Sequence, residues 1–311
     1  MLGKTAGGLF WMFRYLERSE YLARLVEAGF RMGLTSSATA SEWESIVTTA
    51  AAREGYLEKY DAFDQTSVTD YLLRDPSNPS SVLGVVDAAR NNARLVRTAI
   101  TREVWEAVND CWITLKDALR RPVAAGDLPD VLASIRQKSS LVRGALHGTM
   151  LRNDIFNFAR AGTFVERADN TARILDVKYH VLLPSYSGVG GLLDYYQWTS
   201  ILRSVSAVRA YQWVYRDEVK PWNVAELLLL RPEMPRSLRS CYDDVAACLD
   251  AISTAHGGTR GECHRRAGAV AAKLRYARID DIFQSGLHEY LTEMIDQTAE
   301  LGDQIHAFYM K

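Results

Sequence analysis

The sequence lacks the features that mark a secreted, membrane-bound or disulfide-stabilised protein. It has 4 cysteines among 311 residues, none of them in a CxxC motif, which is typical of reduced thiols rather than a disulfide framework or a zinc site. No stretch approaches the ~18 uncharged apolar residues of a membrane-spanning helix. The apolar run at residues 9–13 is followed at once by charged residues, unlike a signal peptide. We therefore expect a cytoplasmic protein without membrane contact.

An excess of charge of either sign is also missing. Lys plus Arg number 37 and Asp plus Glu number 38, for a net charge of −1 at pH 7, so we expect no nucleic-acid or anionic membrane partner. The motifs GxxxxGK[ST], GxGxxG, HExxH and GxSxG are absent, which leaves phosphate-loop, dinucleotide, zinc-protease and hydrolase sites without support. No segment alternates apolar and polar residues in the manner of a β-strand.

What the sequence has is helical periodicity. Apolar residues recur every three or four positions along most of its length, and Pro79, Pro129 and Pro235 stand where helices would begin. The sequence therefore predicts an all-α protein, a helical bundle with short loops. The expected helices span residues 8–34, 80–119, 128–150, 155–183, 191–215, 237–252, 262–276 and 287–308.

The second half of the chain repeats features of the first half. Residues 15–27, YLERSEYLARLVE, align with residues 164–176, FVERADNTARILD, with four identities in thirteen positions. At offsets of 155 and 156 residues the correspondence continues in the same order, 43–47 with 198–202 and 68–82 with 224–238. We expect a single unit over residues 1–311, made of two duplicated helical halves, 1–153 and 154–311, packed with pseudo-two-fold symmetry.

Each half begins with a helix that carries a glutamate–arginine (ER) motif. On a helical wheel, one arc of about 80° holds acid-before-base pairs at a spacing of four residues, which is the favourable orientation. In the first helix this arc contains Glu17, Glu20, Arg24, Glu27 and Arg31, and in the second it contains Glu166, Asp169, Arg173, Asp176 and His180.

Arg18 and Arg167 lie on the opposite, apolar side of their helices. A buried arginine needs a carboxylate, and the duplication offers Glu166 to Arg18 and Glu17 to Arg167 across a contact between the two helices. We interpret the set as a buried structural network, while a ligand- or metal-binding carboxylate cluster and an exposed salt-bridged face stay open. The candidate residues are Glu17, Arg18, Glu20, Arg24, Glu166, Arg167, Asp169 and Arg173.

The sequence predicts no metal or cofactor site and assigns no catalytic residue. A carboxylate-bridged dimetal bundle needs two ExxH motifs besides two glutamates. The six histidines provide none, and Asp303-x-x-His306 is the nearest approach.

Five segments together resemble the Alpha-E family, bacterial all-helical proteins named for their glutamate–arginine motifs. They read FWMFRYLERSEYLARL, RGALHGTMLRND, AGTFVERADNTARILDVKYHVLLP, VAELLLLRPEMPRSLR and IDDIFQSGLHEYL. The positions that match the family's motif are Glu17-Arg18 and Glu166-Arg167. Ser19 stands where the family often has alanine, and residues 161–163 stand where a basic residue and a tyrosine are common. Both departures leave the ER positions intact.

The resemblance implies which proteins accompany the chain, but it assigns no reaction to the chain itself. Alpha-E proteins usually accompany a circularly permuted ATP-grasp protein, often with a transglutaminase-like protease nearby. It therefore implies a non-catalytic helical partner or substrate-positioning subunit of an ATP-grasp-dependent amide- or peptide-forming system. One alternative is an enzyme of that system that uses the Glu17/Glu166 carboxylates for acid/base or metal-dependent chemistry. The other is a structural module that forms homo-oligomers. A partner should expose an apolar patch of more than a few hundred Å².

Overall fold

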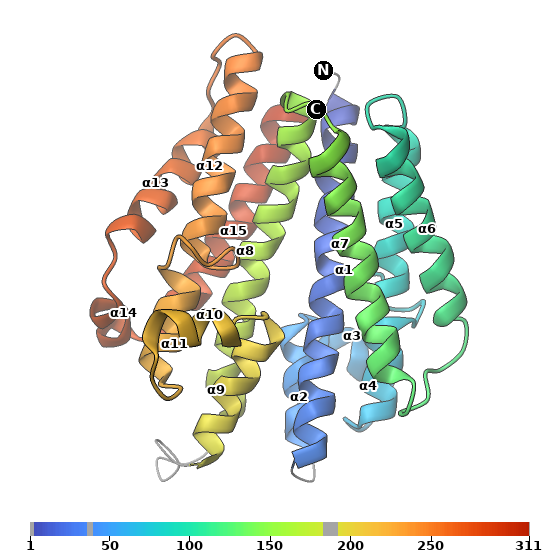
Figure 1. Cartoon of the computed structure of the whole chain (residues 1–311), viewed down its shortest axis with the longest axis vertical. Coiled ribbons are helices and arrows are strands. Elements are labelled where there is room, and N and C mark those ends of the chain that lie inside the picture. The colour runs from blue at the N-terminus through green and yellow to red at the C-terminus, as the bar shows by residue number, and fades with distance from the viewer. Residues whose placement is uncertain (1–2, 36–39, 183–191, 311) are drawn as a thin grey trace.

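The computed structural model (Figure 1) describes residues 3–35, 40–182 and 192–310, and every regular element within them is an α-helix. The all-α prediction is thus confirmed. The first half contains α1 (Gly3–Thr35), α2 (Ala40–Thr49), α3 (Arg53–Leu57), α4 (Gln65–Leu73), α5 (Val82–Leu95), α6 (Arg102–Ala118) and α7 (Leu128–Thr149). The second half contains α8 (Asp154–Leu182), α9 (Leu192–Ser204), α10 (Val208–Tyr215), α11 (Pro221–Leu229), α12 (Leu238–Ala255), α13 (Glu262–Tyr276), α14 (Ile279–Ser285) and α15 (Leu287–Tyr309). None of the helices in these ranges is both long enough and apolar enough to cross a membrane.

The two long helices α1 and α8 lie side by side at the centre of the bundle (Figure 1). Helices α5 and α7 pack against α1, whereas α12 and α15 pack against α8. The backbones of α1 and α8 meet at Gly162, where an added Cβ would lie 2.2 Å from the carbonyl oxygen of Phe10. Only glycine permits this approach. The expected contact between the two ER helices is therefore present, and it requires glycine at position 162 because any side chain there would clash with α1.

Side-chain caps begin several helices close to the positions that the sequence indicates. Ser81 Oγ accepts a hydrogen bond from Gly84 N at 3.2 Å, and Ser237 Oγ accepts one from Ser240 N at 3.0 Å. Each bond satisfies a backbone donor that the first turn of a helix leaves without a partner. Pro129 lies in the first turn of α7, where its missing N–H costs nothing.

Two expected helices are each broken into two. The segment 80–119 forms α5 and α6, because Thr101 Oγ1 accepts from Val104 N at 3.4 Å and starts a new helix. The segment 191–215 contains α9 and α10, separated where Ser206 adopts a left-handed conformation with φ of 58°. Apolar residues continue at helical spacing across both breaks, so the periodicity alone did not locate them.

Candidate functional site

The two glutamate–arginine motifs face each other where α1 packs against α8. Arg18 donates to both carboxylate oxygens of Glu166, at 2.5 Å from Nε and 3.1 Å from Nη2. Arg167 donates to both oxygens of Glu17, at 3.0 Å from Nε and 3.0 Å from Nη2. Both cross-pairs expected from the sequence are therefore present, each as a two-pronged contact between a guanidinium group and a carboxylate.

Three further arginines that the sequence did not single out complete the surroundings of these carboxylates. Arg14, one turn before the motif on α1, donates from Nε to Glu166 Oε2 at 2.8 Å. Arg236, just before α12, donates from Nη1 to Glu17 Oε1 at 2.8 Å. Arg143 of α7 donates from Nη1 to Glu17 Oε2 at 3.2 Å. Glu17 therefore has three arginine partners, and Glu166 has two.

Glu20 joins the same cluster one turn along α1. Its Oε1 accepts from Arg24 Nη2 and from Arg236 Nη2, both at 2.7 Å. Its Oε2 forms an ion pair with Arg143 Nη2 at 2.5 Å. Arg143 and Arg236 thus each bridge Glu17 and Glu20. We use the name ER network for Arg14, Glu17, Arg18, Glu20, Arg24, Arg143, Glu166, Arg167 and Arg236.

The carboxylates, more than the arginines, are the buried part of the network. Glu17, Glu20 and Glu166 are each 1% exposed, whereas the Arg18 side chain is 27% exposed. This reverses the expectation that placed Arg18 on the covered side of its helix. Because α5, α7, α8 and α9 all pack against α1, the part of its charged arc that carries Glu17 and Glu20 is covered as well as its apolar side. An exposed salt-bridged face is ruled out for these three carboxylates.

The arginines keep the buried carboxylates ionised. Burial by itself raises the pKa of Glu17, but the charges of Arg167, Arg236 and Arg143 outweigh it and hold the pKa far below its usual range. In the same way, burial opposes the charges of Arg18 and Arg14, which lower the pKa of Glu166. A general acid or base at neutral pH needs a pKa near that pH. Neither carboxylate meets this condition.

Asp169 and Arg173, the remaining candidates, form a pair of their own on α8. Arg173 Nε donates to Asp169 Oδ2 at 2.8 Å, the spacing of four residues that the sequence indicated. No hydrogen bond of the described chain links this pair to the ER network. The pair is partly exposed, so it belongs to the edge of the site rather than to its centre.

A shallow hollow of about 230 Å³ beside the network contains His147 together with Arg143, Arg160 and Arg167. Burial, followed by the charges of Arg160 and Arg152, lowers the pKa of His147, so the imidazole is neutral at pH 7. Among the described residues that line the hollow there is no carboxylate to orient the ring as in a hydrolytic triad. Over the described ranges, no three His, Cys, Asp or Glu side chains are grouped so as to hold a metal ion.

Fold and site together define an all-helical protein whose two longest helices are joined by reciprocal glutamate–arginine pairs. The chain belongs to the Alpha-E family, described as a predicted alpha-helical domain with a conserved ER motif, and the family profile matches residues 1–310. Comparisons with curated proteins and with solved structures found no match.

Proposed function

We propose that the chain is a non-catalytic helical partner or substrate-positioning subunit of an ATP-grasp-dependent amide- or peptide-forming ligase system. The link to a circularly permuted ATP-grasp protein rests on the family resemblance. The observation that carries the non-catalytic role is the ER network, in which the motif's charged groups bind one another. The proposed place of action is the cytoplasm, where ATP is available to such a ligase.

The contacts of Glu17 and Glu166 support this role over an enzymatic one. Both oxygens of each carboxylate already accept hydrogen bonds from guanidinium groups. A substrate or a metal ion would have to displace an arginine in order to reach either group, and a displaced buried charge is costly. The alternative in which these carboxylates act as acid, base or metal ligands is therefore disfavoured.

We further propose that the two halves of the chain are related by duplication, with the ER network at their contact. Ala51 and Ser206, 155 residues apart, both follow a helix with a left-handed φ of 54° and 58°. Tyr56 and Tyr211, at the same offset, both donate a hydroxyl hydrogen bond to a nearby backbone carbonyl, at 2.7 Å and 2.6 Å. These paired details support a common origin, and superposing the described helices of the halves tests it.

Exposed apolar residues of α10 and α11 offer contacts for a partner. Trp213 of α10 is 74% exposed, Val214 is 43% exposed, and Trp222 of α11 is 41% exposed. Large exposed apolar side chains are typical of interaction sites when they gather in a patch. The same residues would serve homo-oligomerisation, so the partner must be identified by experiment.

Co-expression of the chain with a circularly permuted ATP-grasp protein from the same organism tests the proposal. We expect the two proteins to co-purify as a stable complex and the chain to raise ligase turnover. Trp213→Ala should weaken the complex, whereas Tyr276→Ala, a matched change at a residue of α13 that is 81% exposed, should not. Absence of both a complex and an effect on turnover would refute the partnership, and a homo-oligomer lost with Trp213→Ala would favour the structural module.

A further inference from the structure

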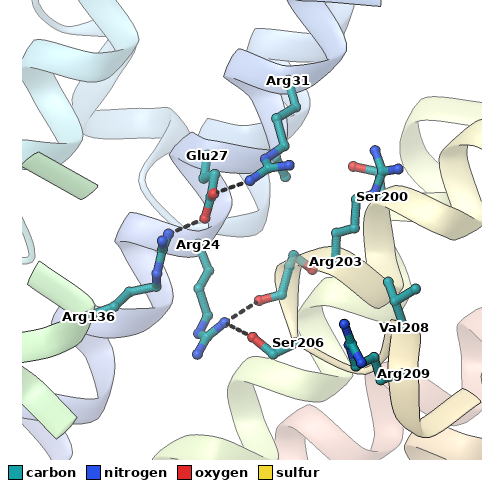
Figure 2. Close-up of a pocket in the computed structure, with 11 residues that line it drawn as sticks. Arg24, Glu27, Arg31, Arg136, Ser200, Arg203, Ser206, Val208 and Arg209 are labelled. Atoms are coloured by element: carbon teal, nitrogen blue, oxygen red, sulfur yellow. Dashed lines mark hydrogen bonds and ion pairs between the residues drawn. The ribbon is translucent and has the colours of Figure 1, made fainter. Parts of the chain in front are cut away.

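Next to the ER network, a cavity of about 430 Å³ opens between α1, α7 and the corner that joins α9 to α10 (Figure 2). Five arginines and one glutamate line it, together with three serines. The formal charge of the lining is thus +4, in a chain whose net charge is −1. The charged lining residues are Arg24, Glu27, Arg31, Arg136, Arg203 and Arg209.

On the α1 side of the cavity, a single carboxylate serves two arginines. Arg31 Nη2 donates to Glu27 Oε1 at 2.7 Å, and Arg136 of α7 forms an ion pair with Glu27 Oε2 (Figure 2). The shared carboxylate therefore orients both arginines on this wall. Glu27 carries one negative charge against their two positive charges, so one positive charge remains unbalanced. Arg136 is only 25% exposed, which reduces the screening of its charge by water.

The opposite wall is the corner between α9 and α10. The left-handed backbone of Ser206 turns the chain there, so that Arg203 from the last turn of α9 and Arg209 from the first turn of α10 line the same cavity. Neither Arg203 nor Arg209 forms an ion pair with any residue that the structure describes. Helix α10 also begins without a side-chain cap, and the positive end of a helix favours anions.

Arg24 connects this corner to the ER network. Its Nη1 donates to Ser206 Oγ at 2.8 Å and to the carbonyl oxygen of Ser204 at 3.1 Å (Figure 2). Its Nη2 donates to Glu20. The corner is therefore held against α1 before any ligand arrives. A binding site that is already in place loses less entropy on binding.

We propose that this cavity binds a phosphate-bearing small molecule, with Arg203 and Arg209 on one side of the anion and Arg31 and Arg136 on the other. The planar guanidinium group matches two phosphate oxygens at once. The volume lies in the range of about 300–1,000 Å³ that is typical of small-molecule sites. Since Glu20 balances Arg24, the other four arginines and Glu27 leave a charge of +3 around the cavity. This charge matches the several negative charges of a diphosphate better than the single charge of a carboxylate. The proposal needs no partner protein, so it stands or falls apart from the ligase role.

Isothermal titration of the purified full-length chain with pyrophosphate and with ATP tests the site, with citrate as a non-phosphate anion at the same ionic strength. We expect pyrophosphate or ATP to bind and citrate to bind at least about tenfold more weakly. Comparison of the two phosphate probes shows whether a nucleoside contributes. Failure of both to bind at millimolar concentration, or equal binding of citrate, would overturn the proposal.

The double variant Arg203→Ala/Arg209→Ala should lose at least about tenfold in affinity, since a charge-assisted hydrogen bond contributes about that factor. The control Arg102→Ala/Arg278→Ala removes the same charge at two arginines outside the cavity that are 82% and 75% exposed, and it should bind as the unmodified chain does. Arg203→Lys/Arg209→Lys keeps the charge and removes the planar fork, so it should show an intermediate affinity. If the pocket variant and the charge control bind equally, the cavity is not the site.

Discussion

Replacing Glu17 by alanine should destabilise the protein more than any other single truncation in the ER network. Glu17 is 1% exposed and accepts from three arginines. Without it, Arg143 and Arg236 still contact Glu20. Arg167 keeps a hydrogen bond to the carbonyl oxygen of Pro235 at 3.4 Å and a cation–π contact with Phe164, but it loses its carboxylate partner. A nearly buried guanidinium group is then stranded.

The magnitude follows from that stranded charge. Breaking a buried ion pair on one side typically costs about 3–5 kcal/mol, which for a chain of 311 residues corresponds to a fall in Tm of roughly 5–8 °C. Arg167→Ala should cost less, about 1.5–3 kcal/mol, because Glu17 keeps Arg143 and Arg236. In the double variant, Arg167 is no longer present to be stranded, so the two costs should not add.

Thermal and urea unfolding, followed by circular dichroism, measure these differences. The control is Glu44→Ala, which removes an exposed pair with Arg53 and should change stability by less than about 1 kcal/mol. The double-mutant cycle of Glu17 and Arg167 should give a coupling of about 0.5–3 kcal/mol. Additive costs, or a loss for Glu17→Ala no larger than that of the control, would refute a buried structural network.

Three further predictions concern pH and the backbone. The pKa values of Glu17 and Glu166 are lowered from 4.5 in the folded chain. Their contribution to the free energy of unfolding is therefore complete above about pH 5 and is lost as the pH falls toward the folded pKa values. Tm should drop steeply below pH 5, and the Glu17→Gln variant should show a shallower drop. Gly162→Ala should lower Tm strongly, because its Cβ would lie 2.2 Å from Phe10 O; an unchanged Tm would show that α1 and α8 do not approach this closely. Ala51→Gly should raise stability by up to about 1 kcal/mol in urea unfolding, since Ala51 has a φ of 54° that glycine adopts without strain; a loss of stability would contradict the left-handed turn.

The sequence was sufficient to predict the helical class and the two cross-pairs, for a physical reason. Helical periodicity places side chains on faces, and an arginine among apolar neighbours has to find an acid. Glu17 and Glu166 are the one identical pair of acids in the repeated motif, so Arg18 with Glu166 and Arg167 with Glu17 followed. Distance between the elements in the sequence did not matter, because the repeated motif itself indicated the pairing.

The remaining arginines could not be found in this way. Arg143 and Arg236 come from elements outside the motif, and their role depends on how deeply Glu17 and Glu20 are buried. Periodicity gives the direction of a side chain but not whether another helix covers it. The arginine-lined cavity was missed for the same reason, since α1, α7 and the α9–α10 corner supply its walls and only packing brings them together.

The two cross-pairs differ in the number of additional arginines around their carboxylates, although the two ER motifs correspond. Variants in which the acid and the arginine of one pair are exchanged test the effect of this difference. In Arg18→Glu/Glu166→Arg, the new cation on α8 would meet one additional arginine, Arg14. In Glu17→Arg/Arg167→Glu, the new cation on α1 would meet both Arg143 and Arg236 at a position that is 1% exposed.

Like charges in a poorly hydrated site repel strongly. The first exchange should therefore give a folded chain with a lowered Tm, whereas the second should abolish cooperative unfolding or soluble expression. Equal stability of the two exchanged variants would show that Arg143 and Arg236 do not act on Glu17. A clear difference would mean that Arg143 of α7 and Arg236 before α12, in addition to the repeated motif, make a negative charge at position 17 necessary for folding.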